Sequence, residues 1–180
     1  MNLSDRFLAK LSNTSPISGN SPKRVADTLY RSWSVLEQEW PTKAANTVEE
    51  FYSEIPEAKK TLALARGAEY EFGYQVVPGS KAAIKEALKN SPVCLSVPAW
   101  WEENGKYFRP PGISDGHWTV CYGLNEQDEF LIFDSYYPFK KVMRADFLPS
   151  MAMSYHLKKK VVNDSAFSRF IRLIKQILWG

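Results

Sequence analysis

A histidine and an aspartate with the spacing of a catalytic pair lie within residues 116–138. His117 opens a run in which bulky apolar side chains alternate with smaller ones, which predicts a strand. A polar turn and a short apolar run at 130–133 follow, and Asp134 comes directly after that run. A β-hairpin of this length brings its two ends together, so we predict that His117 and Asp134 lie side by side. A carboxylate in that position can hold an imidazole in one tautomer and stabilise its protonated form.

The sequence contains two cysteines, and both lie in strand-like apolar runs. Cys121 lies four residues from His117 on the same strand face, about 13 Å away, which is beyond hydrogen-bond reach. Cys94 belongs to a predicted strand at 93–97 that could neighbour the His117 strand, but it lacks the helix N-terminus that lowers the pKa of a catalytic thiol. We interpret both as reduced core cysteines, and Cys94 stays open as an alternative nucleophile.

The elements that must position these residues change character halfway along the chain. Amphipathic spacing and N-cap residues predict helices in the first half, and strands with one further helix follow in the second half. The predicted helices lie near residues 5–11, 22–30, 48–53, 56–67 and 81–88. The predicted strands lie at residues 70–76, 93–97, 117–122, 130–133 and 139–144, and 100–112 is predicted to be a long loop with a turn at Asn104 and Gly105. This order predicts an α+β fold with N-terminal helices packed on a mostly antiparallel sheet.

The composition excludes several classes of function. With 180 residues, 44% of them hydrophobic and 14% aromatic, the chain is long enough for one folded domain. Its only histidines, His117 and His156, are far apart and have no metal-ligand spacing, and no glycine-rich nucleotide motif occurs, so we expect no metal and no cofactor. The short basic run 158–160 does not predict nucleic-acid binding. No signal peptide or long apolar span is visible, which predicts a soluble, cytoplasmic protein.

The last residues differ in charge from the rest, which divides the chain into a domain at 1–157 and a basic C-terminal segment at 158–180. The segment carries six Lys or Arg against one Asp. Apolar residues recur at helical spacing within it, which predicts an amphipathic helix at 166–178. Such a helix must bury its apolar face on its own domain, on a partner chain or at a membrane surface. We expect docking on a protein surface, with a partner next and membrane contact less favoured.

The order of the motifs resembles that of papain-like cysteine peptidases over roughly residues 3–142. The segment LSDRFLAKLSNTSPISGNSPKRVADTLYRSWSVLEQEWP resembles the family's stretch that begins LSEQ and passes through a Gly-Asn-Gly loop and a helix. VPGSKAAIKEALKNSPVCLSVPAW resembles the family's next helix and strand. GHWTVCYGL resembles the block with the catalytic His, and DSYYP resembles the Asn-Ser-Trp block with the third triad member. The resemblance implies a papain-like α+β fold.

The resemblance also implies a role for particular residues. His117 would act as general base and acid, and Asp134, where the family usually has Asn, would orient it. Tyr136 would shield the pair from water in place of a Trp. The substrate cleft would be lined by Gly19 and Asn20 on one wall and by Asp115 and Gly116 on the other.

The resemblance also implies that the helix with the family's nucleophilic Cys is missing from this sequence. The family's nucleophilic Cys opens a long helix upstream of the LSEQ-like segment, after a Gln that helps to form the oxyanion hole. This sequence begins at that segment, so we expect a papain-like domain that is incomplete at its N-terminus. An upstream chain that supplies the Cys helix would be one partner.

Three interpretations stay open. In the first, the chain is the larger part of a cysteine peptidase that hydrolyses peptide bonds through a Cys-His-Asp triad, and it is inactive alone for want of the nucleophile. In the second, it is a pseudoenzyme whose cleft or C-terminal helix holds a peptide or protein partner. In the third, it is an unrelated α+β domain whose aromatic residues form an ordinary core. We expect the first, with the second as its alternative.

Overall fold

The computed structural model describes residues 1–99 and 101–160. Its helices are α1 (Asp5–Leu11), α2 (Pro22–Ser32), the 3₁₀ helix η1 (Thr42–Ala44), α3 (Val48–Phe51), α4 (Glu57–Gly67) and α5 (Lys81–Leu88). The residues that precede four of these helices, Ser4, Ser21, Thr47 and Ser80, each accept a hydrogen bond from the backbone N–H three residues later. These bonds satisfy donors that have no partner within the helix, which explains why the helices begin at these residues.

The strands form one sheet in the order β1-β8-β2-β5-β6-β7-β4-β3. The strands are β1 (Tyr70–Val77), β2 (Val93–Val97), β3 (Trp101–Glu103), β4 (Lys106–Phe108), β5 (His117–Leu124), β6 (Phe130–Phe133), β7 (Lys140–Met143) and β8 (Ala152–Lys159). Neighbouring strands pair antiparallel except β4 and β7, which are parallel. The described residues therefore confirm an α+β fold with a mostly antiparallel sheet.

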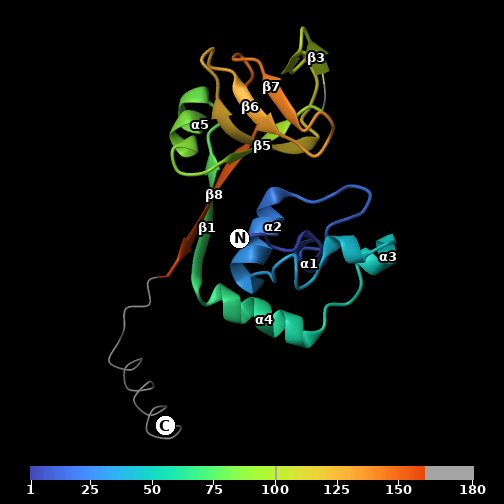
Figure 1. The fold of residues 1–180 in the computed structure, drawn as a ribbon. Helices are drawn as coiled ribbons and strands as arrows, with labels where there is room; N and C mark the ends of the chain where they lie inside the picture. Colours follow the sequence, from blue (N-terminus) through green and yellow to red (C-terminus); the bar gives the residue numbers. More distant parts are fainter. Residues whose placement is uncertain (100, 161–180) are drawn as a thin grey trace, which may run out of the picture.

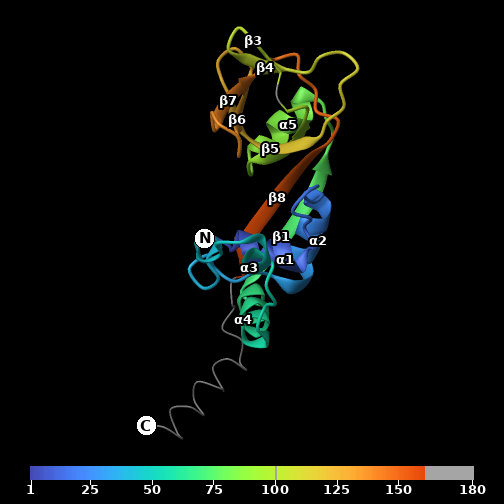
Figure 2. The same ribbon diagram turned by 90° about the vertical axis from the view of Figure 1, so that its right-hand side faces the viewer.

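The helices cover the sheet in two places. Helices α1 to α4 gather beside the lower halves of the long strands β1 and β8, whereas α5 and the remaining strands lie at the other end (Figures 1 and 2). At the lower end Trp33, the residue that follows α2, stacks on Tyr70 of β1 with ring centroids 5.6 Å apart. Ile84 of α5 is fully buried in the core formed with β2, β5 and β6. Residues 1–99 and 101–160 thus form one hydrophobic core under α5 and a second one within the helical layer.

The register decides which face of the sheet each residue occupies. Val97 pairs with His117, and Val93 pairs with Cys121, so these four side chains share the face that packs on α5. The alternate residues point to the opposite face. On that face Val120, Tyr122 and Phe133 stay 37%, 46% and 53% exposed. This apolar strip across β5 and β6 is thus left uncovered by the described residues.

The structure corrects two parts of the sequence analysis. The loop predicted at residues 100–112 is wrong for 101–108, which form the hairpin of β3 and β4 around the predicted Asn104-Gly105 turn. Both turn residues have positive φ, as such tight turns require. Strand β8 was not predicted, and its pairing with β1 carries the sheet past the predicted boundary at 157 to Lys159. The strand predicted at 139–144 is confirmed as β7.

The prediction for the C-terminal segment lies mostly outside the described residues. The helix expected at 166–178 falls entirely beyond residue 160, so its docking stays a prediction. Within residues 1–99 and 101–160, every helix is too short or too polar to cross a membrane.

Candidate active site

The predicted contact between His117 and Asp134 is present. Nε2 of His117 lies 2.9 Å from Oδ2 of Asp134. The imidazole side chain is 17% exposed, whereas the carboxylate is completely buried. With an ionised carboxylate, Nε2 carries the hydrogen and donates it, so Nδ1 is the basic nitrogen of the neutral ring.

Pairing between β5 and β6 produces this contact. Val120 of β5 lies opposite Phe133 of β6. The two strands are antiparallel, so the chain from Val120 back to His117 runs beside the chain from Phe133 on to Asp134. The hydroxyl of Thr119 donates to the Phe133 carbonyl at 2.8 Å. The Asp134 N–H donates to the Phe139 carbonyl at 2.8 Å. The hairpin and its connection to β7 therefore hold the carboxylate in place from both sides.

The surroundings of Asp134 favour its charged form. Burial alone would raise the pKa of this carboxyl, because desolvation disfavours the charge. Hydrogen bonds from the Tyr136 N–H, at 2.7 Å, and from His117 and Thr119 outweigh the burial and lower the pKa below its usual range. Asp134 is therefore ionised at neutral pH and can stabilise an imidazolium at His117.

The ring of Tyr136 contacts the imidazole, and its role as a shield from water stays a prediction. Its ring centroid is 4.9 Å from that of His117, with the planes tilted by 46°. The same residue donates its backbone N–H to Asp134. Tyr136 therefore contacts both members of the pair, although its own ring is 57% exposed.

Lys141 of β7 is a site residue that the sequence analysis missed. Its ammonium lies 3.6 Å from Oδ1 of Asp134, and the side chains of both residues are almost completely buried. The alternation along β7 could have identified it, because Lys141 lies two residues before Met143 and therefore on the same face of the strand. Met143 is fully buried, so this face points into the protein. A lysine at an inward position of a strand requires a buried partner.

The loop at Gly19 and Asn20 is closed by its own hydrogen bonds. Gly19 has a φ of +69°, a conformation that favours glycine, and it pairs with Ser15. The side-chain amide of Asn20 donates to the Ser12 carbonyl and to the Thr14 hydroxyl, at 3.0 Å each. Asn20 also lines an apolar pocket, whereas the role of Gly19 in a cleft stays a prediction.

Asp115 and Gly116 lie directly before His117, but the Asp115 carboxylate is turned into the protein. It forms an ion pair with Arg109 and accepts hydrogen bonds from the backbone and hydroxyl of Ser150. The Gly116 N–H donates to the Val97 carbonyl at 3.1 Å. These contacts hold the approach to His117, and a cleft-lining role for either residue stays a prediction.

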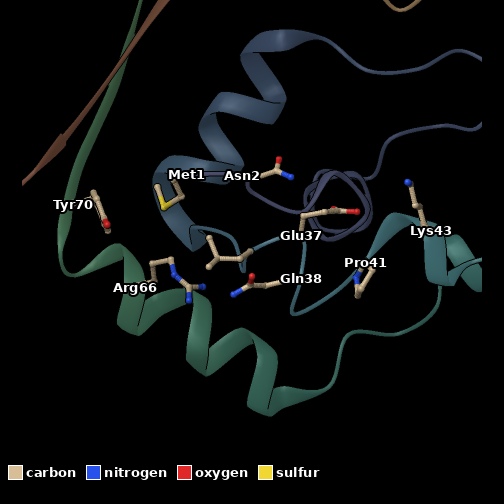
Figure 3. A pocket seen from close by; sticks show the side chains of 9 residues that line it. Met1, Asn2, Glu37, Gln38, Pro41, Lys43, Arg66 and Tyr70 are labelled. Carbon is tan, nitrogen blue, oxygen red and sulfur yellow. The ribbon is translucent and has the colours of Figure 1, made fainter.

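Several hollows lie near the helical layer, among them the following two. A pocket of about 330 Å³ lies between α2 and the sheet, and it is almost entirely apolar. Its lining comprises Asn20, Pro22, Val25, Ala26, Leu29, Phe72, Trp118 and Tyr155. Trp118 follows His117 in the chain, but alternate residues of β5 point to opposite faces of the sheet, so the pocket lies on the other face from His117. A larger hollow, of about 730 Å³, lies between the first residues, residues 36–43 and α4, with Glu37, Lys43 and Arg66 in its lining (Figure 3). It contains no histidine or cysteine.

Neither cysteine is placed to act with His117. Cys94 lies opposite Val120, on the other face of the sheet from His117. Cys121 shares the face of His117 but is fully buried, and its thiol donates to the Gly123 carbonyl. Burial raises the pKa of each thiol to about 11, and a hydrogen bond with Tyr155 offsets part of the effect at Cys94. The structure supports the interpretation of both as core cysteines.

We expect both thiols to react slowly in the folded chain. A pKa of about 11 lowers the thiolate fraction at neutral pH by roughly 100-fold relative to an ordinary cysteine. Alkylation by iodoacetamide at pH 7.5, followed by mass spectrometry, should therefore be at least 100-fold slower than in the chain unfolded by urea. Fast modification of Cys94 in the folded chain would contradict this expectation and reopen its role as a nucleophile.

Comparison with known proteins shows the fold. No family model and no curated protein sequence matches this chain. Among solved structures, the chain is similar to the bromelain protease from Ananas comosus, determined in complex with the E64 inhibitor. The TM-score is 0.64 at 14% sequence identity, and the alignment covers 87% of this chain and 79% of the bromelain chain. Bromelain is a papain-like cysteine protease, so the α+β fold described above resembles the papain-like fold.

Proposed function

We propose that this chain is the His- and Asp-bearing part of a papain-like cysteine peptidase. The observation that carries the proposal is the buried hydrogen bond from His117 to Asp134, within a fold that resembles that of a cysteine protease. In this role His117 takes the proton of a thiol through Nδ1 and later gives it to the leaving amine. Asp134 fixes the tautomer through Nε2 and stabilises the imidazolium between the two steps.

The thiol in this proposal comes from a segment outside the printed sequence, because Cys94 lies on the other face of the sheet from His117 and Cys121 is buried with its thiol bonded to the Gly123 carbonyl. The strip formed by Val120, Tyr122 and Phe133 supports such a covering segment. Three neighbouring apolar side chains, each at least about a third exposed, are costly to leave in water. An added helix with an apolar face would bury them.

The substrate in this proposal is a peptide with an apolar side chain. The pocket of about 330 Å³ between α2 and the sheet offers an almost purely apolar lining and no charged residue. A side chain of the size of Leu or Phe would bury its apolar surface there.

A non-catalytic role is the second candidate, and the same apolar pocket favours it. A pocket of this kind can hold a peptide without cleaving it. In that case the His117–Asp134 pair would serve only to hold the β5–β6 hairpin to the turn that follows it. The two candidates differ in whether bound peptide is cleaved.

We expect the isolated chain to show no thiol-dependent hydrolysis of a fluorogenic peptide with an apolar side chain. A general base without a nucleophile retains little of a covalent mechanism. Co-expression with the polypeptide encoded directly upstream should restore hydrolysis that requires a reducing agent and is blocked by a peptidyl epoxide. Turnover by the isolated chain with the epoxide attached to Cys94 would overturn the proposed source of the thiol. A folded, co-purifying pair that binds the peptide and leaves it intact would favour the non-catalytic candidate.

A further inference from the structure

Lys141 occupies an unusual position beneath the His117–Asp134 pair. The residue is 4% exposed, and its ammonium lies 3.6 Å from the buried Asp134 carboxylate. It also donates hydrogen bonds to the carbonyls of Tyr136 and Pro138, which belong to the turn that joins β6 to β7. One side chain therefore reaches both the carboxylate and the backbone of the residue whose ring covers the imidazole.

The stability of a buried ion pair is the difference between a large desolvation cost and a large electrostatic attraction. Removing either charge alone leaves the other uncompensated in a medium of low dielectric constant, which is strongly destabilising, whereas removing both is much less so. The neighbouring Lys140 is exposed on the opposite face of β7 and provides a natural comparison. The chain thus places a lysine where an apolar residue would normally lie.

We infer that Lys141 is a positioning residue, which compensates the charge of Asp134 and fixes the 135–139 turn so that Tyr136 stays over His117. Lys141 lies at Oδ1 of Asp134, which leaves Oδ2 as the oriented acceptor for His117. The carbonyl of Tyr136 is tied to Lys141 while its N–H is tied to Asp134. The inference concerns the site of the proposed function, but its test needs no peptidase activity, so either one can fail without the other.

The test is a double-mutant cycle on the purified chain with Lys141→Met, Asp134→Asn and the double variant. We expect Lys141→Met to lower the melting temperature by about 10 °C. Adding Asp134→Asn to it should raise the melting temperature again, because the uncompensated carboxylate is then gone. Lys140→Met removes the same charge from the exposed face and should shift the melting temperature by less than about 2 °C.

A proton NMR spectrum tests the positioning role directly, because the chemical shifts of the His117 ring protons would not change if Lys141 contributed only to packing. Tyr136 lies 4.9 Å from the imidazole, so its ring current shifts the ring-proton resonances of His117. Only two histidines are present, and His156→Ala assigns the signals. Lys141→Met should lose most of this shift, whereas Lys140→Met should keep it. The inference is wrong if the melting-temperature changes of Lys141→Met and Asp134→Asn simply add in the double variant. It is also wrong if the spectrum of Lys141→Met is identical to that of Lys140→Met. If Lys141→Met does not fold, failure of the double variant to restore folding would overturn it as well.

Discussion

Replacing His117 with alanine is expected to lower thiol-dependent hydrolysis by the co-expressed pair about 1,000-fold or more. The imidazole is the one group of the site that can take the thiol proton and return it to the leaving amine in the proposed mechanism. Asp134 cannot substitute for it, because its buried carboxylate faces the ring and its pKa is held low. The measurement is kcat/KM for the fluorogenic peptide at neutral pH.

The second histidine provides the matched control for this prediction. His156 lies on β8 and is exposed, so His156→Ala removes the same side chain away from the site. It should leave kcat/KM within about 2-fold of the parent. Circular dichroism would verify that both variants fold. A His117→Ala pair that keeps most of its activity would exclude the proposed general base.

Replacing Arg6 with methionine is expected to destabilise the helical layer by about 3 kcal/mol. Arg6 of α1 is 8% exposed, and its guanidinium donates to the carbonyls of Glu50 and Phe51 and to the hydroxyl of Ser53. It also lies over the Trp40 ring, 4.9 Å from the centroid. Methionine fills similar space but cannot donate, so the Phe51 carbonyl and the Ser53 hydroxyl lose their hydrogen bonds from the guanidinium. Urea unfolding of the purified chain measures the change.

Lys10, a second basic residue of α1, provides the control, because it carries the same charge as Arg6 but its ion-pair partner is exposed. Lys10 forms an ion pair with Glu54, whose side chain is 87% exposed. Lys10→Met should cost less than about 1 kcal/mol, because exposed ion pairs contribute little. Equal effects of the two substitutions would show that the hydrogen bonds of Arg6 do not stabilise the layer.

The local features of the fold could be predicted from the sequence. Ser4, Ser21, Thr47 and Ser80 cap the helices that were expected after them, because a cap acts on backbone groups within three residues. Alternation of apolar residues placed β1 and β5 correctly, and short continuous apolar runs placed β2 and β6. The contact between His117 and Asp134 followed from one hairpin, whose short loop restricts how the two strands can pair.

The features that depend on distant pairing could not be predicted in this way. Strand β8 has a mixed pattern of apolar and basic residues, and it forms because β1 and β2 supply hydrogen-bond partners on both of its sides. The hairpin of β3 and β4 joins the sheet through the single parallel contact of Tyr107 with Met143. Both pairings join segments that are far apart in the sequence, and the residues around each segment do not indicate which strand it will pair with.

Side-chain roles at the site divide in the same way. Types and spacing within residues 116–138 were enough to identify the imidazole and its carboxylate, because a strand and a turn restrict their geometry over short distances. Only the tertiary structure turned Asp115 away towards Arg109 and Ser150 and placed the Lys141 ammonium beside Asp134. A charge enters the interior only where a partner is held within a few ångströms, and packing of the whole sheet decides which partner that is.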